Sequence, residues 1–155
     1  QKVKGLLDQG GRLEESVSEE IANHRQTKGK YIPGFGHRFH KPEDPRAPRL
    51  MKLVSDAEGD KIVSGNFMRI GLEIQRQLSQ GKSTGIAMNI DGATAVIFGE
   101  LGFAPPLARG LFCLSRSVGI LAHAWEQKNQ GGRNKGPTPP EFLWNYSGKN
   151  PLEEG

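Results

Sequence analysis

The chain has 155 residues, 35% of them hydrophobic, and its mean hydropathy is −0.56. This length allows one domain with its own core, whereas no apolar stretch is long enough to span a bilayer and no signal-peptide pattern is expected. Lys and Arg number 21 against 17 Asp and Glu, and the net charge of +4 favours acidic partners such as nucleic acid or a polyanionic cofactor. The single Cys113 cannot form an internal disulfide, so a reducing, cytoplasmic location is expected.

Apolar residues recur at helical spacing along most of the chain, and few stretches alternate with the period of a strand. Leu13, Val17 and Ile21, for example, follow one another at intervals of one helical turn. The expected helices cover residues 13–25, 50–59, 67–78, 93–101 and 105–130, with a punctuated loop over 33–48 and an extended tail from 137. The helix over 93–101 is apolar nearly all round and is expected to be buried. The predicted fold class is all-α.

The loop contains the most informative run of the sequence, Pro33-Gly34-Phe35-Gly36-His37. Glycine lets backbone N–H and C=O groups come close to a ligand because no Cβ is in the way, and proline stiffens the approach. A histidine at the end of such a loop can donate or accept a proton near neutral pH. Taken alone, the run is more simply a surface turn that carries a histidine.

Further motifs follow it in order along the chain: Asp44-Pro45-Arg46, Asn89-Ile90-Asp91, and Ser115-Arg116 running on through Gly119 to Ala122-His123. Together with the Pro-Gly loop they resemble the citrate synthase family, from about residue 10 to 137, and match only its C-terminal part. The resemblance implies the C-terminal portion of a citrate synthase-like helical fold. Residues 1–100 would belong to the small, mobile domain, and residues 101–155 to the last helix and tail of the large domain.

The resemblance also implies a role for each matching residue. The catalytic residues would be His37, which hydrogen-bonds the carbonyl of oxaloacetate, and Asp91, which acts as the base toward the methyl group of acetyl-CoA. Arg46 and Arg116 would bind the carboxylates of oxaloacetate, while Asn89 would help to position the thioester carbonyl. The adenine end of coenzyme A would be held by the main chain of Pro33, Gly34, Phe35 and Gly36. No metal is implied.

Two of these residues also have a structural explanation. Asp91 comes directly before a glycine and an apolar helix, so it could be the N-cap of that helix, and both roles can hold at once. Arg116 lies in an otherwise apolar helix, where a buried cation needs an anionic partner. That partner is either a substrate carboxylate or an internal one, from Glu100 or Glu73.

Other features are expected to be structural. Cys113 is predicted to be a buried thiol and His123 a structural histidine, while His40 is predicted to lie on the solvated surface. By alignment from Arg116, Gly136-Pro137 stands where many citrate synthases carry an Arg-Pro that reaches the substrate of the other subunit. Arg133 is near that place but out of register, so the last carboxylate ligand is not identified.

Asn89-Ile90-Asp91-Gly92 and the residues after His123 are most similar to citryl-CoA lyase and to the citryl-CoA-cleaving module of ATP-citrate lyase. The sequence therefore predicts an enzyme segment for the reaction citryl-CoA ⇌ acetyl-CoA + oxaloacetate, with coenzyme A as part of the substrate. Condensation by a citrate or 2-methylcitrate synthase is the alternative in the same class. A basic nucleic-acid-binding module, favoured by the pI and by residues 130–136, and a non-catalytic fragment that binds coenzyme A are the alternatives of another class.

The family's first catalytic histidine has no match, because His24 is the only histidine before His37 and its neighbours differ. The isolated chain is therefore expected to be an incomplete, inactive part of the enzyme. A homodimer, or association with the missing N-terminal part, is expected. Nucleic acid and membranes are not expected as partners.

Overall fold

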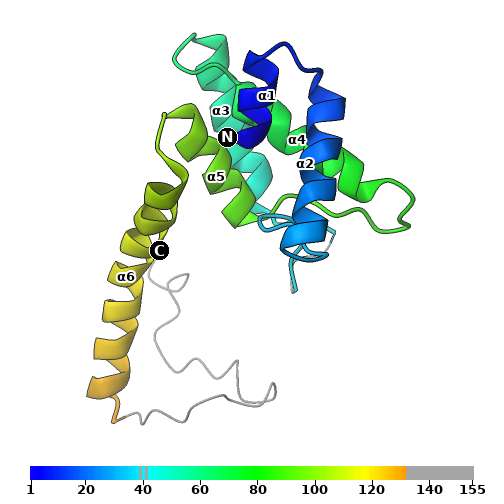
Figure 1. The fold of residues 1–155 in the computed structure, drawn as a ribbon. Coiled ribbons are helices and arrows are strands. Elements are labelled where there is room, and N and C mark those ends of the chain that lie inside the picture. The colour runs from blue at the N-terminus through cyan, green and yellow to red at the C-terminus, as the bar shows by residue number, and fades with distance from the viewer. Residues whose placement is uncertain (39, 41, 132–155) are drawn as a thin grey trace. The chain divides into compact units, whose positions relative to one another are not determined.

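The computed structural model describes residues 1–38, 40 and 42–131. These residues form helices and connecting loops with no strand among them, which confirms the predicted all-α fold (Figure 1). The helices are α1 (Lys2–Asp8), α2 (Leu13–Thr27), α3 (Arg46–Gly59), α4 (Asn66–Ser79), α5 (Ile90–Glu100) and α6 (Pro105–Asn129). The chain divides into two compact units, Gln1–Leu114 and a second that begins at Ser115, and α6 runs from one into the other. The domain division predicted near residue 100 stays a prediction.

The largest differences from the predicted helices concern α1 and the start of α3. α1 is not among the predicted helices, because it is short and carries Gly5 in its interior. α3 begins at Arg46, inside the predicted loop over 33–48. Pro48 lies in the first turn of α3, where backbone N–H groups have no partner within the helix, so proline costs no hydrogen bond there.

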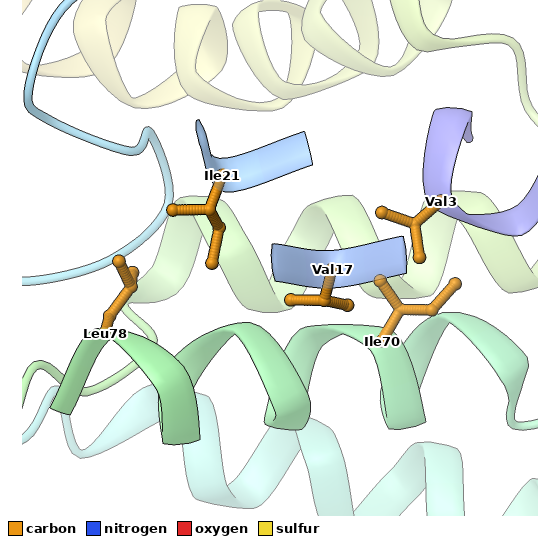
Figure 2. Close-up of a cluster of buried hydrophobic side chains, with 5 residues drawn as sticks. All are labelled: Val3, Val17, Ile21, Ile70 and Leu78. Carbon is orange, nitrogen blue, oxygen red and sulfur yellow. The ribbon is translucent and has the colours of Figure 1, made fainter. Parts of the chain in front are cut away.

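α4 is the central helix of the first unit, since it contacts α1, α2 and α5. Its apolar side meets α1 and α2 in a first core cluster, drawn in Figure 2, whose buried members are Val3, Val17, Ile21, Ile70 and Leu78. Val17 and Ile21 lie one turn apart and therefore face the same side of α2. Val17 is completely buried, at 0% exposure. This cluster fixes α1 and α2 on α4.

A second core cluster joins α3 to α5, and its buried members are Ala47, Val54, Met88, Ala93 and Val96. Phe35, in the loop between α2 and α3, packs against both clusters. The Pro-Gly loop is thus attached to the core of the first unit by its own aromatic side chain.

The N-terminus of α4 is held by a side chain that is distant in sequence. Glu100, the last residue of α5, accepts hydrogen bonds from the backbone N–H groups of Gly65 (3.0 Å), Phe67 (2.7 Å) and Met68 (3.2 Å) and from the hydroxyl of Ser64 (2.9 Å). These N–H groups belong to the first turn of a helix, where they have no intrahelical acceptor. The carboxylate therefore completes α4 and binds α5 to it.

Most residues of α6 are exposed, and none of them is buried. Five apolar residues that follow one another along it at about helical spacing have exposed side chains: Leu107, Leu114, Val118, Leu121 and Trp125. Cys113 is also exposed, so the prediction that it is a buried thiol is wrong. The apolar pattern of α6 was correct evidence for a helix, but the side it would bury has no cover within the described chain. Among the described helices, none combines the length and apolar character needed to cross a membrane.

Candidate active site

The Pro-Gly loop is pinned to the segment that precedes α5. Phe35 and Met88 form an isolated antiparallel bridge, in which the Gly36 N–H donates to Ala87 O at 2.7 Å and the Asn89 N–H donates to Gly34 O at 3.0 Å. Gly34 and Gly36 have φ angles of 89° and 78°, which L-residues with a side chain rarely adopt. The two glycines of the motif are therefore required by backbone conformation.

The loop also meets the first turn of α5 backbone to backbone. A Cβ added to Gly34 would lie 2.8 Å from the Cα of Gly92, and one added to Gly92 would collide with the carbonyl oxygen of Gly34. No side chain can fit at either position without moving the loop away from α5. Gly92, the residue after Asp91, is thus the partner of the loop glycine.

Asn89 is the N-cap of α5. Its Oδ1 accepts hydrogen bonds from the N–H groups of Asp91 (2.9 Å) and Gly92 (3.2 Å), while its Nδ2 donates to Gly36 O at 2.7 Å. The suggestion that Asp91 caps this helix is wrong, because Asp91 is the second residue of α5 and the cap precedes it. Asn89 joins the loop to the helix, and its predicted contact with the thioester carbonyl stays a prediction.

Asp91 is exposed in the first turn of α5. A carboxylate at this place interacts favourably with the partial positive charge of the helix N-terminus. The hydrogen bonds that Arg46 donates to Asp44 are the largest cause of the raised pKa of Arg46, and the charge of Asp91 raises it further. Asp91 and Arg46, two predicted site residues, therefore lie within electrostatic reach of each other.

Asp44 is the most buried polar side chain of the site, at 1% exposure. Its Oδ1 accepts from the backbone N (3.1 Å) and Nε (2.8 Å) of Arg46, and its Oδ2 accepts from Arg46 Nη2 (2.8 Å) and Ile90 N (3.0 Å). The Arg46 side chain, which is the largest cause, holds the pKa of the Asp44 carboxyl well below its usual range. The sequence motifs included Asp44, two positions before a candidate ligand arginine, but no role was predicted for it.

A pocket of about 230 Å³ opens beside the loop. Its walls include Gly36, His37, Asp44 and Asn89, together with residues 84–88. The structure thus brings three predicted site residues, Gly36, His37 and Asn89, to one pocket. Pro33, Gly34 and Phe35 are not among its described walls, and neither are Arg46 and Asp91.

His37 is oriented by His40. The His40 N–H donates to Nδ1 of His37 at 3.0 Å, and the two rings lie 4.5 Å apart at an interplanar angle of 40°. A ring nitrogen that accepts a hydrogen bond carries no proton, so neutral His37 has its proton on Nε2. His40 lines the pocket with His37. His40 is exposed, as predicted, and its contact with His37 is a feature that the sequence did not indicate.

Arg116 lies in the second unit, and its position relative to the pocket is not described. Its side chain is exposed, so the argument that it is a buried cation is wrong. Both suggested internal partners are engaged elsewhere: Glu100 caps α4, and Glu73 accepts from Arg76 (2.7 Å) and Gln77 (2.7 Å). The proposed contact of Arg116 with a substrate carboxylate stays a prediction.

The remaining candidates add little chemistry. His123 is exposed, with Nδ1 at 3.4 Å from Glu126 Oε2. Gly136-Pro137, Arg133 and most of the run 130–136 lie outside the described residues. No group of three or more His, Cys, Asp or Glu side chains within the described ranges is placed to hold a metal ion. That the reaction needs no metal stays a prediction.

Comparison with known proteins establishes the family. Residues 1–137 match the family described as "Citrate synthase, C-terminal domain", and the chain therefore belongs to the citrate synthase family, as its motifs predict. It is 31% identical over 140 residues to the citrate synthase of Acidithiobacillus ferridurans, an alignment that covers 89% of this chain and 36% of that protein. The chain thus spans about a third of the length of this relative.

Two solved structures resemble the fold. The citryl-CoA lyase from Hydrogenobacter thermophilus matches with a TM-score of 0.64 and 28% identity, over 96% of this chain and 55% of that one. The citrate synthase from Thermotoga maritima MSB8 matches with a TM-score of 0.63 and 30% identity, over 99% of this chain and 41% of that one. The likeness therefore extends to members named for cleavage and to members named for condensation.

Proposed function

We propose that this chain is part of an enzyme that cleaves citryl-CoA to acetyl-CoA and oxaloacetate. The observation that carries the proposal is the pinned loop, which places His37 and Asn89 on one pocket and holds the first turn of α5, with Asp91, against Gly34. Membership of the citrate synthase family and the likeness to a citryl-CoA lyase support the reaction class.

In this proposal His37 acts on the oxygen that becomes the carbonyl oxygen of oxaloacetate. With Nδ1 engaged by the His40 N–H, the neutral ring donates an Nε2–H hydrogen bond to that oxygen, whose hydroxyl proton passes to solvent as the carbon–carbon bond breaks and the carbonyl forms. Asp91 returns a proton to the carbon that becomes the methyl group of acetyl-CoA. Arg46 and Arg116 bind the carboxylates of the oxaloacetate half.

Coenzyme A is the proposed acyl carrier. Its adenine end would lie against the main chain of the Pro-Gly loop, from Pro33 to Gly36, where the glycines leave the backbone uncovered. The net charge of +4 favours a polyanion of this kind. No metal has a part in the proposed reaction.

The remaining parts of the enzyme are proposed to lie outside these 155 residues, since the chain spans 36% of its curated relative and has no match for the family's first histidine. Its exposed apolar helix α6 supports association with a second copy or with that missing part. A cytoplasmic location is part of the proposal, because the exposed Cys113 suits a reducing compartment. Nucleic acid and membranes are not among the proposed partners.

Condensation is the second candidate, favoured by the curated relatives named citrate synthase. A coupled assay on the intact enzyme, meaning this chain with the polypeptide that completes the family length, separates the two. Release of oxaloacetate from citryl-CoA supports cleavage, with Asp91→Asn as the inactive control. Thiol release from acetyl-CoA and oxaloacetate, without any turnover of added citryl-CoA to oxaloacetate, would replace cleavage by condensation.

A further inference from the structure

We propose that Asp44 is a positioning residue of this site, which holds Arg46 in its carboxylate-binding orientation and fixes the turn of α5 that carries Asp91. The inference rests on the proposed function, because it assigns Arg46 to a substrate carboxylate. It adds a residue that acts through others and does not itself touch substrate.

The burial of the Asp44 carboxylate is the first observation that supports this role. A carboxylate at 1% exposure is unfavourable unless its oxygens are fully engaged. Here each oxygen accepts two hydrogen bonds, three from Arg46 and one from Ile90. A residue needed only to fill space would be apolar, so the buried charge points to a requirement for its acceptors.

The first consequence concerns Arg46. Asp44 engages Nε and Nη2, which form one edge of the guanidinium, while the Arg46 side chain remains 49% exposed. Within the described ranges Nη1 donates no hydrogen bond. An arginine clamped along one edge presents its remaining N–H groups in a fixed direction, so little side-chain freedom is left to lose when a carboxylate binds.

The second consequence concerns α5. Oδ2 of Asp44 accepts from the N–H of Ile90, the first residue of that helix, at 3.0 Å. The negative charge lies at the positive end of the helix and adds to the Asn89 cap. One carboxylate thus connects Arg46 to the helical turn of Asp91, across 46 residues of sequence.

Asp44→Asn tests the carboxylate with the least change of shape. Whichever way the amide is turned, its NH₂ group faces two donors, either the N–H and Nε of Arg46 or Nη2 and Ile90 N. Arg46 therefore loses its hydrogen bonds to at least one of the two Asp44 side-chain oxygen positions. Asp56→Asn is the matched control, because Asp56 is an exposed acid on α3 that pairs only with Lys52 among the described residues.

The experiment measures oxaloacetate and coenzyme A affinity by calorimetry in the intact enzyme, for Asp44→Asn, Arg46→Ala and the double variant. We expect Asp44→Asn to weaken oxaloacetate binding about ten- to a hundredfold, as misplaced binding groups do, with coenzyme A affinity within about twofold of the parent. The double variant should bind oxaloacetate no more weakly than Arg46→Ala, because Asp44 acts through Arg46. The inference would be overturned if the losses of oxaloacetate affinity in the two single variants multiplied in the double variant. It would also be overturned if Asp44→Asn lost affinity for oxaloacetate and for coenzyme A equally.

A second readout remains if Asp44→Asn does not fold. In the parent enzyme the Nε–H resonance of Arg46 should have a downfield proton shift typical of a charge-assisted hydrogen bond and keep it when oxaloacetate is added. A shift typical of a solvated arginine would overturn the inference. If the parent enzyme binds oxaloacetate but does not cleave citryl-CoA, the proposed function fails while these measurements still judge Asp44.

Discussion

Asn89 uses both ends of one side-chain amide, the oxygen for the N-terminus of α5 and the nitrogen for Gly36 O. Asp91 is therefore not needed as the cap of α5. Helix capping and the proposed proton transfer therefore belong to different residues. The role of Asp91 can be tested by substitution without loss of the helix cap.

Asp91→Asn should leave the stability of the first unit nearly unchanged, with a loss of at most about 0.3–1 kcal/mol from the weaker interaction with the helix dipole. Asparagine cannot take up a proton at neutral pH, so the turnover of the intact enzyme should fall by about 10²–10⁴-fold. Solvent deuterium exchange into the methyl group of acetyl-CoA, followed by NMR, reports this proton transfer alone. Unchanged exchange in the variant would remove Asp91 from the mechanism.

Acid should destabilise the fold through Asp44. Its pKa is lowered in the folded state, so its contribution to the free energy of unfolding is complete above the ordinary Asp pKa of about 4 and is lost as the pH falls below it. Glu73, whose pKa Arg76 lowers, acts in the same direction. Urea unfolding at pH 7, 5 and 3 should show a decline that is shallower in Asp44→Asn. An equal decline in the variant would mean that other carboxylates carry the effect.

At the scale of helices, the N-terminus of α4 depends on Glu100 at the end of α5. In Glu100→Gln one of the two acceptor oxygens becomes an NH₂ group, which leaves the N–H of Gly65 or those of Phe67 and Met68 facing a donor. We expect a loss of about 1–3 kcal/mol in the free energy of unfolding, the cost of a buried donor without its acceptor. Urea titration beside Glu19→Gln, on the exposed face of α2, measures it; equal stability of the two variants would contradict the prediction.

Helices with strong local signals could be predicted from sequence, and contacts between distant residues could not. α4 was predicted at residues 67–78 because its apolar residues recur at helical spacing before a glycine. α1 is stabilised by the packing of Val3 in the first core cluster. The seven residues of this helix do not by themselves indicate that contact. The loop glycines and His37 were found because their chemistry is local, whereas the role of Asp44 depends on Ile90 and that of His40 on the fold of the loop.

For the whole molecule, α6 predicts association. Val118 and Leu121 are each 71% exposed and Trp125 is 63% exposed. An obligate interface of this kind would bury on the order of 2,000 Å² or more. Light scattering of the purified chain should show a dimer or a larger species, and Leu121→Glu should shift it toward the monomer, while Lys128→Glu on the same helix should not. A stable monomeric parent chain with little binding of hydrophobic dye would contradict this.

Phe35 packs against both core clusters. We therefore expect the Pro-Gly loop to detach only when the first unit unfolds. The N–H groups of Gly36 and Asn89 are hydrogen-bonded within the bridge that Phe35 forms with Met88, next to that anchored ring. Amide hydrogen exchange at these two loop positions should therefore be as slow as in the middle of α4, and should respond to denaturant with the same slope. A ligand held by such a loop would bind and dissociate without local unfolding of the loop. Its binding free energy would then stabilise the whole first unit against unfolding.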